Sequence, residues 1–219
     1  MDIFDILGPV MVGPSSSHTA GAVRIGLIAR KLLGSQPTKA HIYLHGSFAA
    51  TGVGHGTDRA LIAGLLGMLP DDINIPKSFE LANEKGLEFI FEQKNIKDAH
   101  PNTTRLDIED GDGKNLSLQA SSIGGGRIVV TKIDNMEVNF SGEKPTLIIQ
   151  SVDEKGCLAG ITKTISDNEI NIATMQLYRE KRGGDVIMVI EMDQQITKES
   201  LRYLEQLKGV NKVTYLLTD

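Results

Sequence analysis

Hydroxyl and imidazole side chains cluster near the start of the chain in a form that could hold an anion. Residues 13–19 read Gly-Pro-Ser-Ser-Ser-His-Thr, and residues 20–33 after them have the apolar spacing of an amphipathic helix. Unpaired backbone N–H groups and the helix dipole favour a carboxylate or a phosphate at a helix N-terminus. One hydroxyl is enough to cap a helix, so this run favours a ligand site over a simple cap. The candidate residues are Ser15, Ser16, Ser17, His18 and Thr19.

A second histidine stands between two glycines, just before another predicted helix. Residues 54–58 read Gly-His-Gly-Thr-Asp, and residues 57–68 are expected to be helical. Glycine neighbours leave the imidazole of His55 unobstructed, and imidazole is a common general base near neutral pH. The alternative is that Thr57 or Asp58 caps the helix and that His55 is a solvated loop residue.

Four of the five histidines stand in loop-like contexts beside Gly, Ser, Thr, Pro or Asn. Because these four fall within the first 100 residues, we expect a shared polar pocket; they are His18, His45, His55 and His100. His41 begins an apolar strand and is expected to have a structural or surface role. No H-x-x-x-H pair or H-E-x-x-H motif occurs, which argues against a zinc site.

Composition excludes several classes of protein. The 219 residues are 40% hydrophobic and 23% charged with a net charge of −5, which is typical of a globular protein and unlike a nucleic-acid-binding one. No apolar run approaches the roughly 20 residues that span a bilayer, and the first residues are acidic where a secretory signal is basic. The single cysteine, Cys157, fits a reducing compartment, so we expect a cytoplasmic protein. An iron–sulfur cluster needs about three or four thiolates, which this chain cannot supply.

The pattern along the chain predicts two domains, 1–143 and 144–219, joined by a turn-forming linker. The first is expected to be α+β, with helices over 20–33, 57–68 and 78–85 and strands over 41–45, 87–91, 104–108, 116–120 and 127–133. Glycines 124–126 lack the Lys and Ser/Thr of a phosphate loop and are expected to form a tight bend. The second domain has the ferredoxin-like order βαββαβ, with strands over 146–152, 171–179, 186–192 and 210–217 and helices over 156–168 and 197–207.

Several motifs of the first domain resemble one enzyme family. From about residue 4 to the C-terminus, the chain resembles the beta subunit of bacterial iron–sulfur-dependent L-serine dehydratase. The motifs that carry this resemblance are GPSSSHTAG-x-x-RIG, HGS, GHGTDRA, HPNT and SIGGG. The resemblance implies a lyase that converts L-serine to pyruvate and ammonia, with a 4Fe–4S cluster held by a separate alpha subunit. This chain would then bind no metal and be inactive alone. His55 would be the base, and Thr57 and Asn102 would join Ser15–Thr19 in binding L-serine.

The second domain resembles an ACT domain, a small ligand-binding module that often pairs through its sheet. This resemblance implies homodimerisation and an effector site formed by Ser151, Asp153, Gly156 and Asn171. Serine-binding members tend to have His and Asn where this chain has Ser151 and Asp153, so the identity of the effector stays open.

Two other interpretations remain open. The first domain is also similar to the allosteric substrate-binding domains of some 3-phosphoglycerate dehydrogenases, so the chain could be a non-catalytic module that senses serine or another small anion. It could also be a plain binding scaffold, with all chemistry on another protein. A partner that carries cluster cysteines would favour the enzyme.

Overall fold

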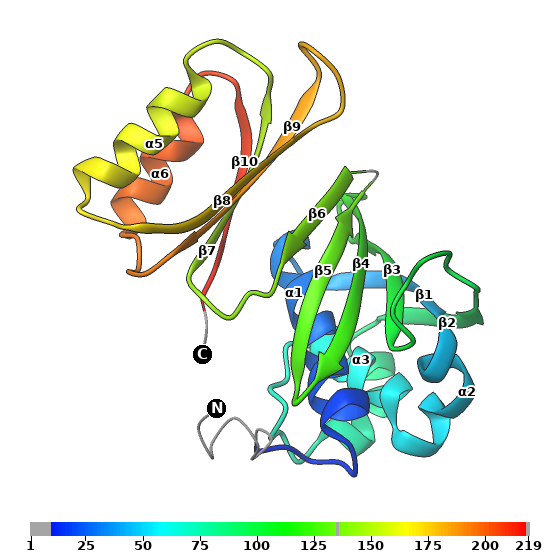
Figure 1. The fold of residues 1–219 in the computed structure, drawn as a ribbon. Helices are drawn as coiled ribbons and strands as arrows, with labels where there is room; N and C mark the ends of the chain where they lie inside the picture. The colour runs from blue at the N-terminus through cyan, green and yellow to red at the C-terminus, as the bar shows by residue number, and fades with distance from the viewer. Residues whose placement is uncertain (1–9, 135, 218–219) are drawn as a thin grey trace. The chain divides into compact units, whose positions relative to one another are not determined.

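The computed structural model describes residues 10–134 and 136–217. Residues 1–9, whose acidic side chains are unlike a secretory signal, lie outside the described residues. The chain divides into two compact units, Met1–Asn135 and Met136–Asp219, and each is described by itself (Figure 1). Within the described residues, no helix is both long and apolar enough to cross a membrane.

A six-stranded mixed sheet has the strand order β2-β1-β3-β4-β5-β6. β1 pairs parallel with β2 and antiparallel with β3, and the β3–β4 and β4–β5 pairs are antiparallel. The five strands predicted in the first domain are confirmed, whereas β6 was not predicted. The strands are β1 (Pro37–Leu44), β2 (Glu88–Gln93), β3 (Thr103–Asp110), β4 (Asn115–Gly124), β5 (Arg127–Ile133) and β6 (Met136–Phe140).

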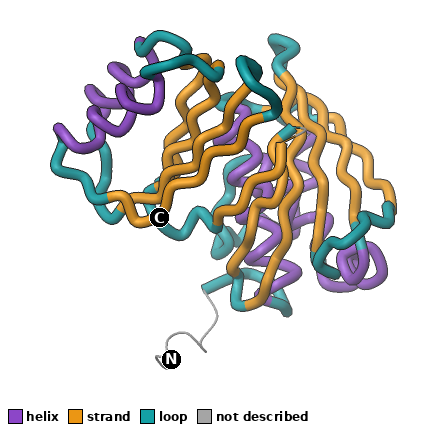
Figure 2. The backbone as a smooth tube through the Cα atoms, turned by 45° about the horizontal axis from the view of Figure 1, so that its top comes forward, coloured by secondary structure: helices purple, strands orange, loops and turns teal. Residues whose placement is uncertain are grey.

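The sheet is apolar on one face only. In β1 the side chains of Ala40, Ile42 and Leu44 are buried, while Lys39 and His41 lie on the opposite face, as the period of two requires. Helix α1 packs on the buried face and helix α3 packs against α1 (Figures 1 and 2). The three predicted helices are confirmed with small shifts, as α1 (Ala22–Leu33), α3 (Thr57–Leu65) and α4 (Ser78–Glu84), the last preceded by a 3₁₀ turn (Ile75–Lys77).

Two segments differ from the expectation. The helix expected from residue 20 begins instead as a π-helical turn, Ser16–Gly21, which continues into α1. Residues 46–55, for which no element was predicted, form helix α2 (Gly46–His55). Three glycines within α2 explain why this helix was not predicted. Each glycine destabilises a helix by about 1 kcal/mol relative to alanine, so the helix propensity of the segment is low.

From Thr146 onward, the second unit has the predicted βαββαβ order. Its sheet has the strand order β10-β7-β9-β8, with all three neighbouring pairs antiparallel, and both helices lie on one face (Figure 1). Cys157 is 8% exposed in the core between helices and sheet, as a small hydrophobic side chain would be. The elements are β7 (Thr146–Val152), α5 (Cys157–Asp167), β8 (Ile172–Arg179), β9 (Asp185–Met192), α6 (Lys198–Gln206) and β10 (Val210–Leu216).

Candidate functional site

The serine run opens the π-helical turn. Ser15 is extended, with φ −142° and ψ 124°, and its Oγ accepts the backbone N–H of His18 at 3.2 Å. The backbone N–H of Thr19 donates to the carbonyl of Ser15 at 2.8 Å. A π-helical turn inside a helix is rare and is frequent at functional sites. Here it presents Ser16 and Ser17, both half-buried, whose hydroxyls have no hydrogen-bond partner among the described residues.

Helix α2 holds the imidazole of His18 in place. The Nε2 of His18 lies 3.2 Å from the Oγ of Ser47 and 3.2 Å from the Oγ1 of Thr51. Its Nδ1 lies 3.4 Å from the Oγ of Ser15, and the ring meets Phe48 edge-on, with the centroids 5.2 Å apart. Both ring nitrogens of His18 therefore have hydroxyl partners within the protein.

His55 is the last residue of α2 and lies beside His18. Ser47, Thr51 and His55 are four residues apart in succession, so they share one face of the helix. The imidazole centroids of His18 and His55 are 5.0 Å apart. His55 is exposed, and its ring has no hydrogen bond within the described part of the chain. The structure thus brings together the two histidines that carry the predicted binding and base roles.

The other histidines have separate partners. The Nδ1 of His45 accepts the backbone N–H of Ile96 at 3.1 Å, and the Nδ1 of His100 accepts that of Asn102 at 3.1 Å. His41 lies on the outer face of the sheet, 3.0 Å from a carboxylate oxygen of Glu92. Of the four loop-like histidines, the structure therefore pairs only His18 and His55.

Burial lowers the pKa of His18, and the charge of the neighbouring His55 lowers it further, although a hydrogen bond with Ser47 opposes this. A lowered pKa favours the neutral ring, since burial and a like charge both penalise the imidazolium form. The surroundings of His18 therefore favour its neutral form.

Three buried hydroxyls near this segment have no hydrogen-bond partner among the described residues: Thr19, Thr57 and Ser122. Glycines let other segments approach two of them closely. A Cβ added to Gly13 would lie 2.3 Å from the Oγ1 of Thr19, and one added to Gly21 would lie 2.1 Å from the Oγ of Ser122. Ser122 was not predicted as a site residue, although it belongs to the SIGGG motif.

Asn102 lies between the start of α2 and the end of β4. Its carbonyl accepts the backbone N–H of Ser122 at 3.0 Å, and the preceding carbonyl, of Pro101, accepts that of Ser47 at 2.7 Å. The glycines 124–126 all have positive φ and form the predicted tight bend. Arg24 of α1 donates to the carbonyl of Gly126 at 2.9 Å, which ties this bend to the helix that follows the serine run.

Two family models match the chain. The serine dehydratase beta chain model matches residues 1–85, and the ACT domain model matches residues 146–209. A probable L-serine dehydratase beta chain of Bacillus subtilis is 41% identical to this chain, over 97% of this chain and 96% of its own length. The chain belongs to the L-serine dehydratase beta-chain family.

Other relatives differ in how much of their length is matched. The L-serine dehydratase beta chain of Peptoniphilus asaccharolyticus is 38% identical, over 96% of this beta chain and 94% of its own length. A D-3-phosphoglycerate dehydrogenase of Methanocaldococcus jannaschii is 26% identical over 72% of this beta chain, which is only 30% of the dehydrogenase.

Two of the four predicted effector residues, Asp153 and Asn171, have side-chain partners within the ACT unit of this beta chain. The carboxylate of Asp153 accepts hydrogen bonds from the guanidinium of Arg179 and from the backbone N–H of Gly183, each at 2.9 Å. Both bonds lower the pKa of Asp153, and the bond from Gly183 has the larger effect. Asn171 donates to Asp193 at 2.7 Å. Ser151 is buried, and Gly156 precedes α5 with φ +90°. Their role in effector binding stays a prediction.

The donor set of this beta chain does not fit an iron–sulfur cluster. Cys157 is its only cysteine, and it is packed in the apolar core of the ACT unit. Among the described residues, no three His, Cys, Asp or Glu side chains lie close enough together to hold a metal ion. A cluster with three or four thiolate ligands must be held by another chain.

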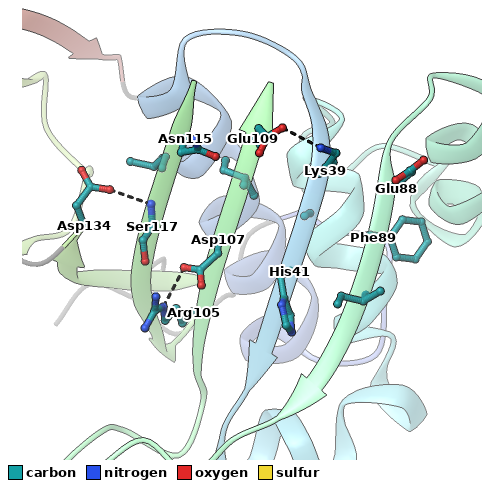
Figure 3. A pocket seen from close by; sticks show the side chains of 14 residues that line it. Lys39, His41, Glu88, Phe89, Arg105, Asp107, Glu109, Asn115, Ser117 and Asp134 are labelled. Atoms are coloured by element: carbon teal, nitrogen blue, oxygen red, sulfur yellow. Dashed lines mark hydrogen bonds and ion pairs between the residues drawn. The ribbon is translucent and has the colours of Figure 1, made fainter. Parts of the chain in front are cut away.

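A shallow cavity of about 580 Å³ lies on the outer face of the first sheet, lined by none of the predicted site residues (Figure 3). The Lys and Arg side chains of its lining each form an ion pair with a carboxylate of the same lining. Lys39 bonds Glu109 at 2.9 Å, and Arg105 bonds Asp107 at 2.9 Å, as the dashed lines in Figure 3 mark. The two other carboxylates of the lining, Glu88 and Asp134, leave the cavity with an excess of negative charge.

Proposed function

We propose that this beta chain binds L-serine and accepts its α proton, and that an alpha subunit carrying a 4Fe–4S cluster completes the L-serine dehydratase. The observation that carries the proposal is the pairing of an exposed His55 with an anchored His18 beside the serine run. The single cysteine supports placing the cluster on the partner, and the same free thiol fits a cytoplasmic enzyme.

The π-helical turn would bind the substrate carboxylate. Ser16 and Ser17 offer two hydroxyls without described partners at the start of a helix, where the dipole also favours an anion. Thr57 and Asn102 would add further polar groups to this binding site. His55 is the free imidazole next to this turn, so its ring can reach a substrate that the turn holds.

The net reaction needs one proton acceptor and one site for the departing hydroxide. Removal of the α proton and the β hydroxide from L-serine yields 2-aminoacrylate and water. Addition of water then releases ammonia and leaves pyruvate, so that all atoms balance. In this proposal His55 takes the α proton and the turn fixes the carboxylate, which places the Cα–H within reach of the base.

Replacing both Ser16 and Ser17 by alanine is expected to raise the KM for L-serine about tenfold or more in the assembled enzyme, with a much smaller change in kcat. The reason is that a hydrogen bond to a charged group contributes about 1.5–3 kcal/mol to binding. Steady-state kinetics of pyruvate formation measures both constants.

The control is Ser166→Ala, at an exposed serine of α5, which should leave both constants unchanged. An unchanged KM in the folded double variant would move the carboxylate site away from the serine run.

A further inference from the structure

The hydroxyl groups around His18 favour one of its two ring nitrogens as the site of the proton. Thr51 donates its hydroxyl proton to the backbone carbonyl of Ser47, with the Oγ1–O distance 2.9 Å. With its proton in that bond, the Thr51 Oγ1 can act only as an acceptor toward the Nε2 of His18, which lies 3.2 Å away. This arrangement favours Nε2 as the donor. The Oγ of Ser47, also 3.2 Å away, can accept the same N–H.

The other nitrogen has a complementary partner. The Oγ of Ser15 accepts the backbone N–H of His18, and its own hydroxyl proton is free to point at the Nδ1, 3.4 Å away. An unprotonated Nδ1 accepts that proton, which completes a neutral ring with hydrogen only on Nε2.

We propose that Thr51 and Ser47 are positioning residues of this enzyme, which hold His18 as the neutral Nε2–H tautomer and so leave His55 as the proton acceptor. The functional part rests on the role of His55 proposed above. All groups recorded against the His18 ring come from two elements: Ser15 from the turn, and Ser47, Phe48, Thr51 and His55 from α2.

This arrangement matters once His55 has taken a proton. Its imidazolium then stands with its centroid 5.0 Å from that of His18, and a second positive charge at that distance would oppose the transfer. An anchored, neutral His18 avoids the repulsion. It also lacks a free lone pair that could compete with His55 for the substrate proton.

The test is nitrogen NMR of the full chain labelled with ¹⁵N-histidine, because protonated and bare ring nitrogens have widely different chemical shifts. His18 signals are identified by their loss in His18→Gln. We expect Nε2 protonated and Nδ1 bare at neutral pH. In Ser47→Ala/Thr51→Val, which removes both acceptors, we expect the Nδ1–H form to appear, while Thr51→Ser keeps the original form.

In the assembled enzyme the same double variant should lower kcat about tenfold, because misplacing a group near the substrate slows the reaction even when that group does not react. The conservative Thr51→Ser variant should keep a normal kcat. The matched control is Thr162→Val, because Thr162 makes the same bond to its own helix, with its Oγ1 3.0 Å from the carbonyl of Leu158, and touches no imidazole.

Predominance of the Nδ1–H form in the unsubstituted chain would overturn this proposal, and so would unchanged His18 signals in the folded double variant. The NMR result does not depend on turnover. Failure of the unsubstituted chain to support activity with its partner would therefore count against the proposed function alone.

Discussion

Replacing His55 by glutamine is expected to lower the kcat of the assembled enzyme about a hundredfold or more, with little change in the KM for L-serine. Loss of a positioned proton acceptor typically costs this much, whereas carboxylate binding at the serine run stays in place. Glutamine keeps a polar side chain at the exposed end of α2 but has no basic nitrogen. Steady-state kinetics separates the two constants.

His41→Gln is the matched control for this experiment, because His41 lies on the outer face of the sheet and pairs with Glu92. It should leave kcat unchanged. If cluster-loaded, folded His55→Gln enzyme turns over at a near-normal rate, His55 is not the base, and the proton acceptor must be sought on the alpha subunit.

Replacing Gly64 by alanine is expected to lower the free energy of unfolding by about 3 kcal/mol, the upper end of the usual cost of overpacking. Helices α1 and α3 cross in backbone contact, and a Cβ on Gly64 would lie 2.1 Å from the carbonyl oxygen of Val23. The atom in the way belongs to the backbone, so the clash cannot be relieved by the rotation of a side chain. Denaturant unfolding followed by circular dichroism gives the difference.

Gly54→Ala is the control, since a Cβ there would meet nothing within 4 Å. It should be neutral or stabilise α2 by up to about 1 kcal/mol, the difference in helix propensity. Equal stability of the two variants would show that the two helices do not cross at this distance.

The second unit could be predicted element by element because its pattern is local. β7 and β9 are short apolar runs that are almost fully buried, and the apolar stripe of α5 packs on the same core. Such runs and stripes can be read directly from the sequence. Helix α2 has no such signal. Its glycines lower its propensity, and its stability comes from packing that the sequence alone does not reveal.

The site depends on that missed helix. His18 and His55 were predicted from residue type and neighbours, but Ser47 and Thr51 were not, because their alignment with His55 exists only if residues 46–55 are helical. Ser122 reaches the site from the end of a strand about a hundred residues after the serine run, and its place beside Gly21 depends on the tertiary packing. The chemical type of each site residue can be read from the sequence, whereas the packing that brings these residues together cannot.

The most direct test of the proposed function is pyruvate formation from L-serine by this chain alone, by a cysteine-bearing alpha subunit alone, and by the two mixed after anaerobic loading with iron and sulfide. The one cysteine of this chain cannot hold a cluster, so only the loaded mixture should form pyruvate. Turnover by the isolated chain would contradict the division of labour between two subunits, and an inactive mixture with a loaded cluster would contradict the assignment of this chain as the substrate-binding half.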